Sequence, residues 1–180
     1  MKLNKQNKKV YILVAAIILL AIAITVAAVV ALNGLHAAGT SANGQPVELV
    51  PTHYIAIEIQ NQGTITAELY GEVAPLTVEN FIGLVDRQYF DGLTFHRIIP
   101  GFMMQGGAGG PAENIKGEFA HNGIANDLKH TPGVLSMARS MMRDSAGSQF
   151  FIMTSTSPHL DGEYAAFGKV LTGYEVAEGI

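Results

Sequence analysis

The alternation of apolar and polar residues after residue 50 predicts β-structure. His53–Ile59 (HYIAIEI) and Thr64–Tyr70 (TITAELY) alternate with a period of two, which is typical of half-buried strands. Residues 61–63 (NQG) separate the two segments and supply the residue types of a tight turn. The two segments therefore predict a β-hairpin.

A helical period follows in Pro75–Tyr89 (PLTVENFIGLVDRQY). Its apolar residues recur every three or four positions and predict an amphipathic helix; they are Leu76, Val78, Phe81, Ile82 and Val85. Thr77 and Asn80 stand three residues apart near its start and provide only a weak capping pattern. We therefore expect one helix here, with weak capping at its start.

Five short apolar runs, broken by Gly, Asn and Pro, follow this helix and have the length of strands. They are Leu93–Ile99, Gly101–Gln105, Gly133–Ala138, Gln149–Thr154 and Ala166–Leu171. Several short strands around one early helix favour an antiparallel barrel or a sandwich. Residues 106–131 lack clear periodicity and predict a long loop.

Two of these runs mix polar residues with bulky apolar ones. Alternate residues of a strand share a face, which groups Phe95, Arg97 and Ile99 in one run and Gln149, Phe151 and Met153 in another. An arginine in such an alternation is unusual for plain core packing. The residue types alone leave open that this arginine caps a barrel end or extends to solvent.

An uninterrupted apolar run, Val10–Leu32, precedes the domain and contains 23 residues without charge or proline. As a helix it would be roughly 34 Å long at about 1.5 Å per residue, enough to cross a hydrocarbon core of about 30 Å. The run is longer than the apolar part of a secretory signal peptide, so we expect an uncleaved transmembrane signal anchor, with cleavage near Ala37–Gly39 as the alternative. The four lysines of residues 1–9 place the N-terminus in the cytoplasm and the rest of the chain outside.

These features divide the chain into four parts. Residues 1–9 form a cytoplasmic basic tail, residues 10–32 the transmembrane anchor, residues 33–47 a flexible linker rich in Gly, Ala, Ser and Asn, and residues 48–180 the folded domain. The expected location is the cell membrane, crossed once, with the domain extracytoplasmic, or secreted if the anchor is cleaved.

Composition excludes several classes of site. The chain has no cysteine, so disulfides, thiol nucleophiles and cysteine-ligated metals are ruled out. Four of the 11 Lys and Arg residues lie in residues 1–9, so the remainder carries 15 acidic and seven basic residues. A remainder with a net charge of −8 is a poor candidate for binding nucleic acid, and no such partner is expected.

Patterns for metal, phosphate and hydrolytic sites are weak. No metal site is expected, because the histidines after residue 90 lack the spacing of paired ligands; they are His96, His121, His130 and His159. The glycines of residues 106–110 are not followed by the Lys-Ser/Thr of a phosphate loop. Ser148, His159 and Asp161 are the residues of a hydrolase triad, but no G-x-S-x-G turn surrounds the serine, so this class is a remote alternative.

Three long motifs resemble the cyclophilin-type peptidyl-prolyl isomerases. They are FHRIIPGFMMQGG (residues 95–107), GSQFFI (residues 147–152) and HLDGEYAAFGKV (residues 159–170), and they occur in that family's order. The resemblance runs from about His53 to the end of the chain and is greatest to bacterial members. It implies a mainly β fold, a closed antiparallel eight-stranded β-barrel with capping helices. The apolar run of residues 10–32 adds the expectation of one N-terminal transmembrane helix before this barrel.

The resemblance also implies roles for individual residues. Arg97 matches the family's catalytic arginine. Gln105 and Gln149 match the two glutamines that orient the arginine and the substrate backbone. The wall of the proline pocket is matched by Phe102, Met103, Phe151 and Leu160.

The remaining matches lie along the path of the peptide. Ala138 and Arg139 match the edge on which the substrate lies, with the backbone N–H of Arg139 holding a substrate carbonyl. Tyr164 stands where many members carry a histidine. His159 stands where members sensitive to cyclosporin usually carry a tryptophan, so only weak binding of that inhibitor is expected.

The implied reaction suits these residue types. Rotation about an Xaa–Pro bond is opposed by amide resonance, with a barrier of about 18–20 kcal/mol. No bond breaks, so no nucleophile, metal or cofactor is expected. A permanently charged guanidinium can donate to the prolyl nitrogen as its lone pair localises, and this hydrogen bond strengthens only in the twisted state.

We therefore expect a peptidyl-prolyl isomerase that acts on proline-containing polypeptides and assists the folding of secreted or surface proteins. The alternative is a non-catalytic module or chaperone that grips proline-containing segments. The family continues past the position of Ile180 into a closing barrel strand, and without that strand the first strand is expected to present an unpaired edge.

Overall fold

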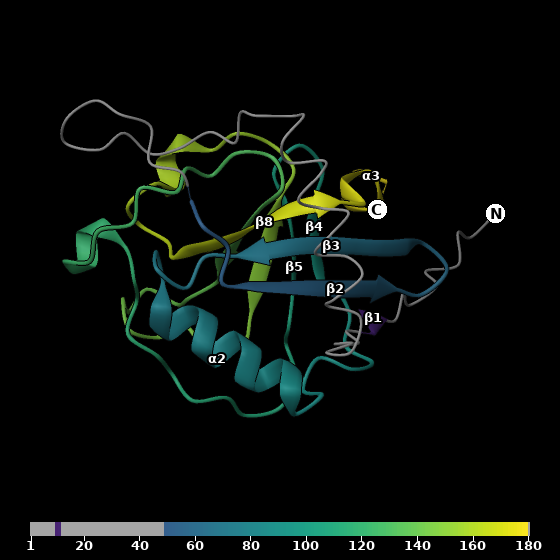
Figure 1. Ribbon diagram of the computed structural model, residues 1–180, viewed down its shortest axis with the longest axis horizontal. Helices are drawn as coiled ribbons and strands as arrows, with labels where there is room; N and C mark the ends of the chain where they lie inside the picture. The colour runs from purple at the N-terminus through teal and green to yellow at the C-terminus, as the bar shows by residue number, and fades with distance from the viewer. Residues whose placement is uncertain (1–9, 12–48, 180) are drawn as a thin grey trace.

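Antiparallel strands form one sheet in the computed structural model, which describes residues 10–11 and 49–179 (Figure 1). The sheet order is β1-β2-β3-β8-β6-β7-β5-β4. The strands are β1 (Val10–Tyr11), β2 (His53–Ile59), β3 (Gly63–Leu69), β4 (Arg97–Ile99), β5 (Met103–Gly106), β6 (Val134–Met137), β7 (Phe150–Met153) and β8 (Ala166–Thr172). The helices are α2 (Pro75–Asp86) and α3 (Tyr174–Glu178), with 3-10 turns η1 (Ala120–Asn122) and η2 (Pro158–Leu160).

The sheet is open, so the expectation of a closed barrel is wrong. β4 stands at one end of the strand order and β1 at the other, and no pairing joins these ends among the described residues. A barrel closes only when its two edge strands share hydrogen bonds. The sheet curls instead, so that β2 and β3 run across β4 and β5 (Figure 1).

The transmembrane helix expected from Val10 onward is also corrected. Val10 and Tyr11 pair with Ile59 and Glu58 of β2 and form the edge strand β1 rather than the first turn of a helix. None of the helices in the described part of the chain is long and apolar enough to cross a membrane. The rest of the predicted anchor, residues 12–32, and the predicted linker, residues 33–47, lie outside the described residues.

The hairpin predicted from the alternating segments is confirmed. β2 and β3 pair along their whole length, from His53 opposite Leu69 to Ile59 opposite Gly63. The turn between them uses Asn61 at a positive φ of 61°, a conformation that asparagine tolerates better than most residues. The predicted helix is confirmed as well, although it ends at Asp86 rather than Tyr89.

The concave face of the sheet is filled by the main core, which we call the inner cluster. Helix α2 packs on this face, and the ring of Phe81 lies 5.2 Å from that of Phe150 and 5.1 Å from that of Phe167. The largest fully buried side chains of the inner cluster are Ile57, Ile65, Leu69, Phe81, Leu84, Phe90, Met104, Phe119, Leu135, Met137, Phe150 and Phe167.

The other face of the same strands carries a second apolar group, which we call the outer cluster. Its buried members are Met103, Val134, Phe151, Met153, Leu160 and Ala166. Because successive residues of a strand point to opposite faces, Met103 and Met104 of β5 enter different clusters, as do Phe151 and Ile152 of β7. The central strands are therefore buried on both sides.

One expected grouping of side chains is wrong. Phe95 does not share a face with Arg97, because β4 begins only at Arg97 and the alternation does not extend back to residue 95. The ring of Phe95 packs against the inner cluster and lies 5.9 Å from that of Phe150.

The N-terminus of α2 is capped from a distant part of the chain. The carboxylate of Glu118, which is 1% exposed, accepts hydrogen bonds from the backbone N–H of Leu76 (3.0 Å), the N–H of Thr77 (2.8 Å) and the hydroxyl of Thr77 (2.7 Å). A carboxylate at this position satisfies unpaired amides and interacts favourably with the helix dipole. This residue supplies the cap that the local sequence lacks.

We predict that Glu118→Ala lowers the free energy of unfolding by about 2–4 kcal/mol, because it leaves buried donors without an acceptor. Urea denaturation measures the change. Glu79→Ala, at an exposed position of the same helix, is the matched control and should cost less than about 0.5 kcal/mol. Equal midpoints for the two variants would show that Glu118 does not hold the helix.

Candidate active site

Three polar side chains cross strands at the end of the sheet formed by β4 and β5. Arg97 of β4 stands opposite Gln105 of β5, and its Nη1 donates to Oε1 of Gln105 at 3.3 Å. The Nε2 of Gln105 donates in turn to Oε1 of Gln149, just before β7, at 2.8 Å. We call Arg97, Gln105 and Gln149 the polar row. In the polar row, Gln105 therefore accepts a hydrogen bond from Arg97 and donates one to Gln149.

The guanidinium of Arg97 has no ion-pair partner within residues 49–179. The ion pairs found among residues 49–179 involve Lys129, Arg139 and two histidines, but not Arg97. Its side chain is exposed, and in the described part of the chain one of the five guanidinium N–H groups is engaged, by Gln105. The remaining donors are available to a ligand.

The outer cluster lies beside the polar row and forms an apolar wall. In the strand register, Gln105 pairs with Phe151 of β7, and Met103 pairs with Met153. The four residues matched to the proline pocket come together here: Met103, Phe151 and Leu160 are buried, and Phe102 packs against them. The structure therefore places a charged donor at the border of an apolar surface.

Aromatic rings frame this wall. Phe102 stacks with the exposed ring of His159, with centroids 6.0 Å apart and planes at 22°. Phe151 contacts Tyr164 edge-on, with centroids 5.9 Å apart and planes at 80°. The residues of the wall and its frame thus come from the turn before β5, from β5 and β7, from η2 and from the segment after η2.

A groove of about 450 Å³ continues from the polar row along the predicted peptide path. Gln105 and Gln149 belong both to the row and to the groove, so an extended peptide on the row can run into it. The other lining residues are Gly110, Ala112, Asn114, Ala138, Arg139, Ser140, Ser145, Gly147 and Ser148. The backbone N–H of Ala138 donates to the carbonyl of Gln149 at 2.9 Å, which fixes the edge of the groove.

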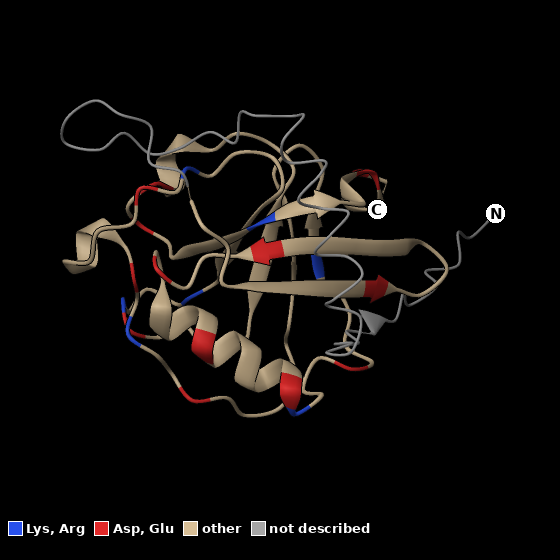
Figure 2. Cartoon of the chain, in the orientation of Figure 1, with Lys and Arg blue, Asp and Glu red and all other residues tan. Residues whose placement is uncertain are grey.

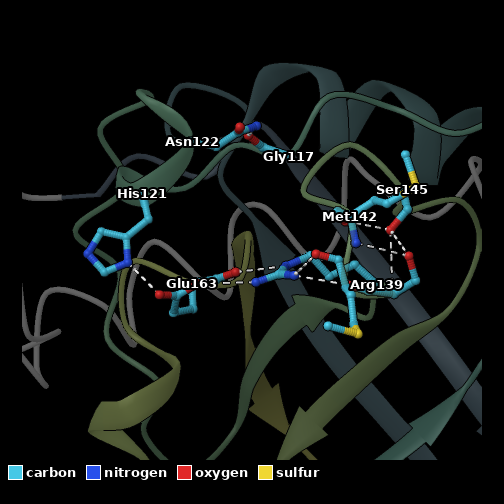
Figure 3. A network of polar contacts seen from close by, with 9 residues as sticks. Gly117, His121, Asn122, Arg139, Met142, Ser145 and Glu163 are labelled. Atoms are coloured by element: carbon cyan, nitrogen blue, oxygen red, sulfur yellow. Dashed lines mark hydrogen bonds and ion pairs between the residues drawn. The ribbon is translucent and has the colours of Figure 1, made fainter.

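The side chain of Arg139 is committed to the protein rather than to a ligand (Figure 3). Its guanidinium lies between the rings of Phe119 and Tyr164, 5.0 Å and 4.7 Å from their centroids. Nη2 pairs with the carboxylate of Glu163 at 3.2 Å, and Nη1 donates to the carbonyl of Ser140 at 3.0 Å. Only the backbone of Arg139 is left to bind a substrate.

The carboxylate of Glu163 joins a second rim residue to this contact. Nδ1 of His121 binds the other oxygen of Glu163 (Figure 3). The hydrogen bond with His121 and the nearby charges of His121 and Arg139 lower the pKa of Glu163 below its ordinary value. The carboxylate is therefore ionised at neutral pH and holds both partners at the rim.

A buried hydrogen-bonded chain lies behind the apolar wall. The ring of His130 is 1% exposed; its Nδ1 lies 3.0 Å from Oδ1 of Asp161, and its Nε2 lies 3.0 Å from Oγ of Ser136. Burial lowers the pKa of His130, although Asp161 partly opposes the shift. Burial works against the charge of Asp161, but hydrogen bonds from the backbone N–H and the ring of His130 lower its pKa overall.

Sequence reasoning missed this chain. In the sequence, His130 stands out only as one of several widely spaced histidines, and Ser136 lies unmarked within an apolar run. His130 and Asp161 stand 31 residues apart, so no local spacing connects them. Among the described residues, no group of three or more His, Asp and Glu side chains could hold a metal ion.

The hydrolase triad considered from the sequence is not assembled. The hydroxyl of Ser148 donates to the carbonyl of Gly107 at 2.8 Å and lies 3.1 Å from the hydroxyl of Tyr89. His159 stacks on Phe102, while Asp161 binds His130. The three residues therefore have separate partners.

Comparisons with known proteins agree on one family. A family model described as cyclophilin type peptidyl-prolyl cis-trans isomerase/CLD matches residues 54–180. A peptidyl-prolyl cis-trans isomerase of Helicobacter pylori strain J99 is 46% identical over 129 residues, which is 68% of this chain and 76% of that protein. Peptidyl-prolyl cis-trans isomerase B of Bacillus subtilis strain 168 is 45% identical over 135 residues, 72% of this chain and 90% of that protein.

A solved structure agrees as well. The crystal structure of a Cryptosporidium parvum cyclophilin type peptidyl-prolyl cis-trans isomerase in the presence of the dipeptide Ala-Pro superposes with a TM-score of 0.57 at 35% identity. The match covers 64% of this chain and 77% of that one.

The buried histidine generates a prediction about pH. Because the pKa of folded His130 is lowered, the unfolded chain binds the proton more readily, and stability from this group is lost as the pH falls below the unfolded value of about 6.5. The free energy of unfolding should fall by up to about 1.4 kcal/mol per pH unit from this group alone. Urea denaturation at pH 7.5 and 5.5 measures the slope.

The dependence of the unfolding free energy on pH should be weaker in His130→Gln, which cannot take up the proton. It should be unchanged in His53→Gln, at an exposed position of β2. Parallel slopes for the parent and His130→Gln would contradict the prediction.

Proposed function

Because the chain belongs to the cyclophilin-type peptidyl-prolyl cis-trans isomerase family and is itself such an isomerase, we propose that Xaa–Pro rotation occurs where its polar row meets its outer cluster. The observation that carries this assignment is the charge of Arg97, which has no ion-pair partner within residues 49–179 and is held by Gln105 at the border of an apolar wall. The dipeptide Ala-Pro accompanying the Cryptosporidium parvum relative supports a proline-containing peptide as the ligand.

The apolar wall holds the proline ring while the rest of the peptide turns. Phe102, Met103, Phe151 and Leu160 present carbon atoms to the ring and exclude water from the prolyl nitrogen. Tyr164 and His159 border the wall through their contacts with Phe151 and Phe102. A fixed ring leaves the acyl half of the bond as the part that rotates.

Arg97 stabilises the twisted state. As conjugation is lost, the prolyl nitrogen gains a localised lone pair and accepts a hydrogen bond from the guanidinium. This bond is weak in the planar ground state, so it lowers the barrier rather than merely tightening binding. Gln105 orients the guanidinium, and Gln149 orients Gln105, so the donor is in place before the substrate rotates.

The groove holds the peptide on one side of the rotating bond. Among the described residues, the N–H of Arg139 has no hydrogen-bond partner, and we assign it to a substrate carbonyl because Arg139 lines the groove beside Ala138. The contacts of the Arg139 side chain keep this stretch of backbone in position. Gln149 also binds the substrate backbone.

We predict that Arg97→Ala lowers kcat/KM for isomerisation by about 10²–10³-fold, the usual cost of removing one donor to a developing charge. Arg97→Lys should recover only part of the loss, because an ammonium lacks the planar fork that Gln105 holds. The rates are measured by cis–trans exchange of an Xaa-Pro peptide, with circular dichroism of each variant to confirm folding. Arg87→Ala, an exposed position at the end of α2, is the control.

The same experiment separates the two candidate functions. A parent that binds the peptide without accelerating exchange would favour the non-catalytic chaperone or binding module. Equal rates for the parent and Arg97→Ala would contradict the role given to Arg97.

The proposed location is the cell membrane with the isomerase domain outside, where it would assist folding of secreted or surface proteins. The support is the sequence of residues 1–32, in which four lysines precede a long apolar run. Figure 2 shows acidic residues on α2 and along the loops with few basic residues between them, so little positive charge would attract the domain to anionic lipid.

The location predicts that the full chain, produced in a bacterial host, sediments with membranes and is digested by protease added to intact spheroplasts. Deleting residues 12–32, which spares the edge strand β1, should leave the protein in the cytoplasm and protected. Protection of the full chain would contradict this location.

Weak cyclosporin binding is also proposed, on the ground that His159 rather than tryptophan stacks on Phe102. His159→Trp should tighten binding of the inhibitor, as titration of cyclosporin against isomerase activity would show; unchanged inhibition would contradict the proposal.

A further inference from the structure

One strand register links the polar row to the buried chain of Ser136, His130 and Asp161. Gln105 of β5 pairs with Phe151 of β7, and Phe151 pairs on its other side with Ser136 of β6. Paired residues on one face of a sheet are direct neighbours. Phe151, a wall residue of the pocket, therefore stands between a residue that orients Arg97 and a residue that binds His130.

His130 contacts Phe151 directly. The two rings stack with centroids 6.1 Å apart and planes at 22°. Because the ring of His130 is bound at both nitrogens, it cannot rotate without breaking a buried hydrogen bond. A ring fixed in this way limits how far the ring of Phe151 can move away from the pocket.

His130 also holds η2, which carries a second wall residue. Its backbone carbonyl accepts from the N–H of Ser157, immediately before η2, at 2.8 Å. Its backbone N–H donates to Oδ1 of Asp161, immediately after η2, at 2.9 Å. Leu160 lies between these two contacts, so both ends of its segment are tied to one residue.

The residue type suits this arrangement. A neutral imidazole donates from one nitrogen and accepts at the other. The ionised Asp161 selects the tautomer with the proton on Nδ1, which leaves Nε2 to accept from the hydroxyl of Ser136. A phenyl ring would keep the stacking without the hydrogen bonds, and an amide would keep hydrogen bonds without the stacking.

We propose that His130 is a positioning residue that fixes Phe151 and Leu160 relative to each other and so sets the shape of the proline pocket. This role rests on the proposed function, and it adds two residues, His130 and Ser136, that lie outside the proposed site. His130 and Ser136 are buried and act through Phe151 and η2 rather than on the substrate. The pocket must hold the proline ring still during rotation, so a looser pocket should slow turnover more than it weakens binding.

The test compares the full chain with Ser136→Ala, His130→Gln and His130→Phe. Isomerisation of an Xaa-Pro peptide gives kcat and KM, and ¹³C-labelled phenylalanine gives NMR signals of the Phe151 ring, assigned with Phe151→Leu. We expect kcat to fall about tenfold in Ser136→Ala and His130→Phe, with KM within about twofold, a loss typical of small misplacements in a site. His130→Gln should retain an intermediate kcat, because it can still bind Asp161 and Ser136.

A control separates positioning from general destabilisation. Ile65→Val removes one carbon from the inner cluster on β3, away from the outer face, and should leave kcat and the Phe151 signals unchanged. If Ile65→Val slows turnover as much as Ser136→Ala does, the effect is one of stability and the proposal fails. If His130→Phe does not fold, Ser136→Ala still decides, because it removes a single oxygen.

The outcomes also separate this proposal from the proposed function. An active parent whose kcat and Phe151 signals survive Ser136→Ala and His130→Gln overturns the role of His130 alone. An inactive parent overturns the proposed function, but the NMR signals of Phe151 still report whether His130 fixes its ring. Broadening of these signals in Ser136→Ala supports the positioning role of His130, and unchanged signals overturn that role.

Discussion

Burial of the central strands on both faces is the constraint on which the rest of the structure depends. β5, β6 and β7 send alternate side chains into the inner cluster and the outer cluster. A shift of one residue in their pairing would exchange the core for the pocket wall, so packing of the core also fixes the register of the site. Met103 and Phe151, two residues of the pocket wall, therefore lie on strands whose register is fixed by the core.

The two arginines at the proposed site have different partners: Arg139 pairs with a carboxylate, whereas Arg97 is bound by a neutral amide. Arg139 is paired with Glu163, enclosed by two aromatic rings and hydrogen-bonded to Ser140, so its charge organises the groove rim. Arg97 is held only through Gln105, a neutral residue. A neutral partner orients the guanidinium without lowering its ability to stabilise charge on a substrate, which suits a reaction that breaks no bond.

The sequence predicts the elements whose signals are local. The period-two segments give the hairpin of β2 and β3, the helical stripe gives α2, and alternation within the later runs groups Phe151 with Met153. The family motifs predict which side chains gather around Arg97. Phe95 shows the limit of this reasoning, because the start of a three-residue strand decides which face a side chain takes.

Features that depend on distant partners could not be predicted in this way. Glu118 caps α2 from 41 residues away, and Asp161 binds His130 from 31 residues away. Neither pair leaves a repeating pattern in the sequence, since each is created only when the sheet curls. The closed barrel was implied by the resemblance alone, because the periodicity of two edge strands does not encode whether they pair.

The most direct test of the account is two-dimensional NMR on the full chain with an Ala-Pro peptide, which records cis–trans exchange of the peptide and the amide shifts of the protein together. We expect accelerated exchange and amide shifts concentrated at β4, β5, the start of β7 and residues 138–139. Accelerated exchange with shifts confined to α2 and the inner cluster, or shifts at the predicted site without any acceleration, would contradict it.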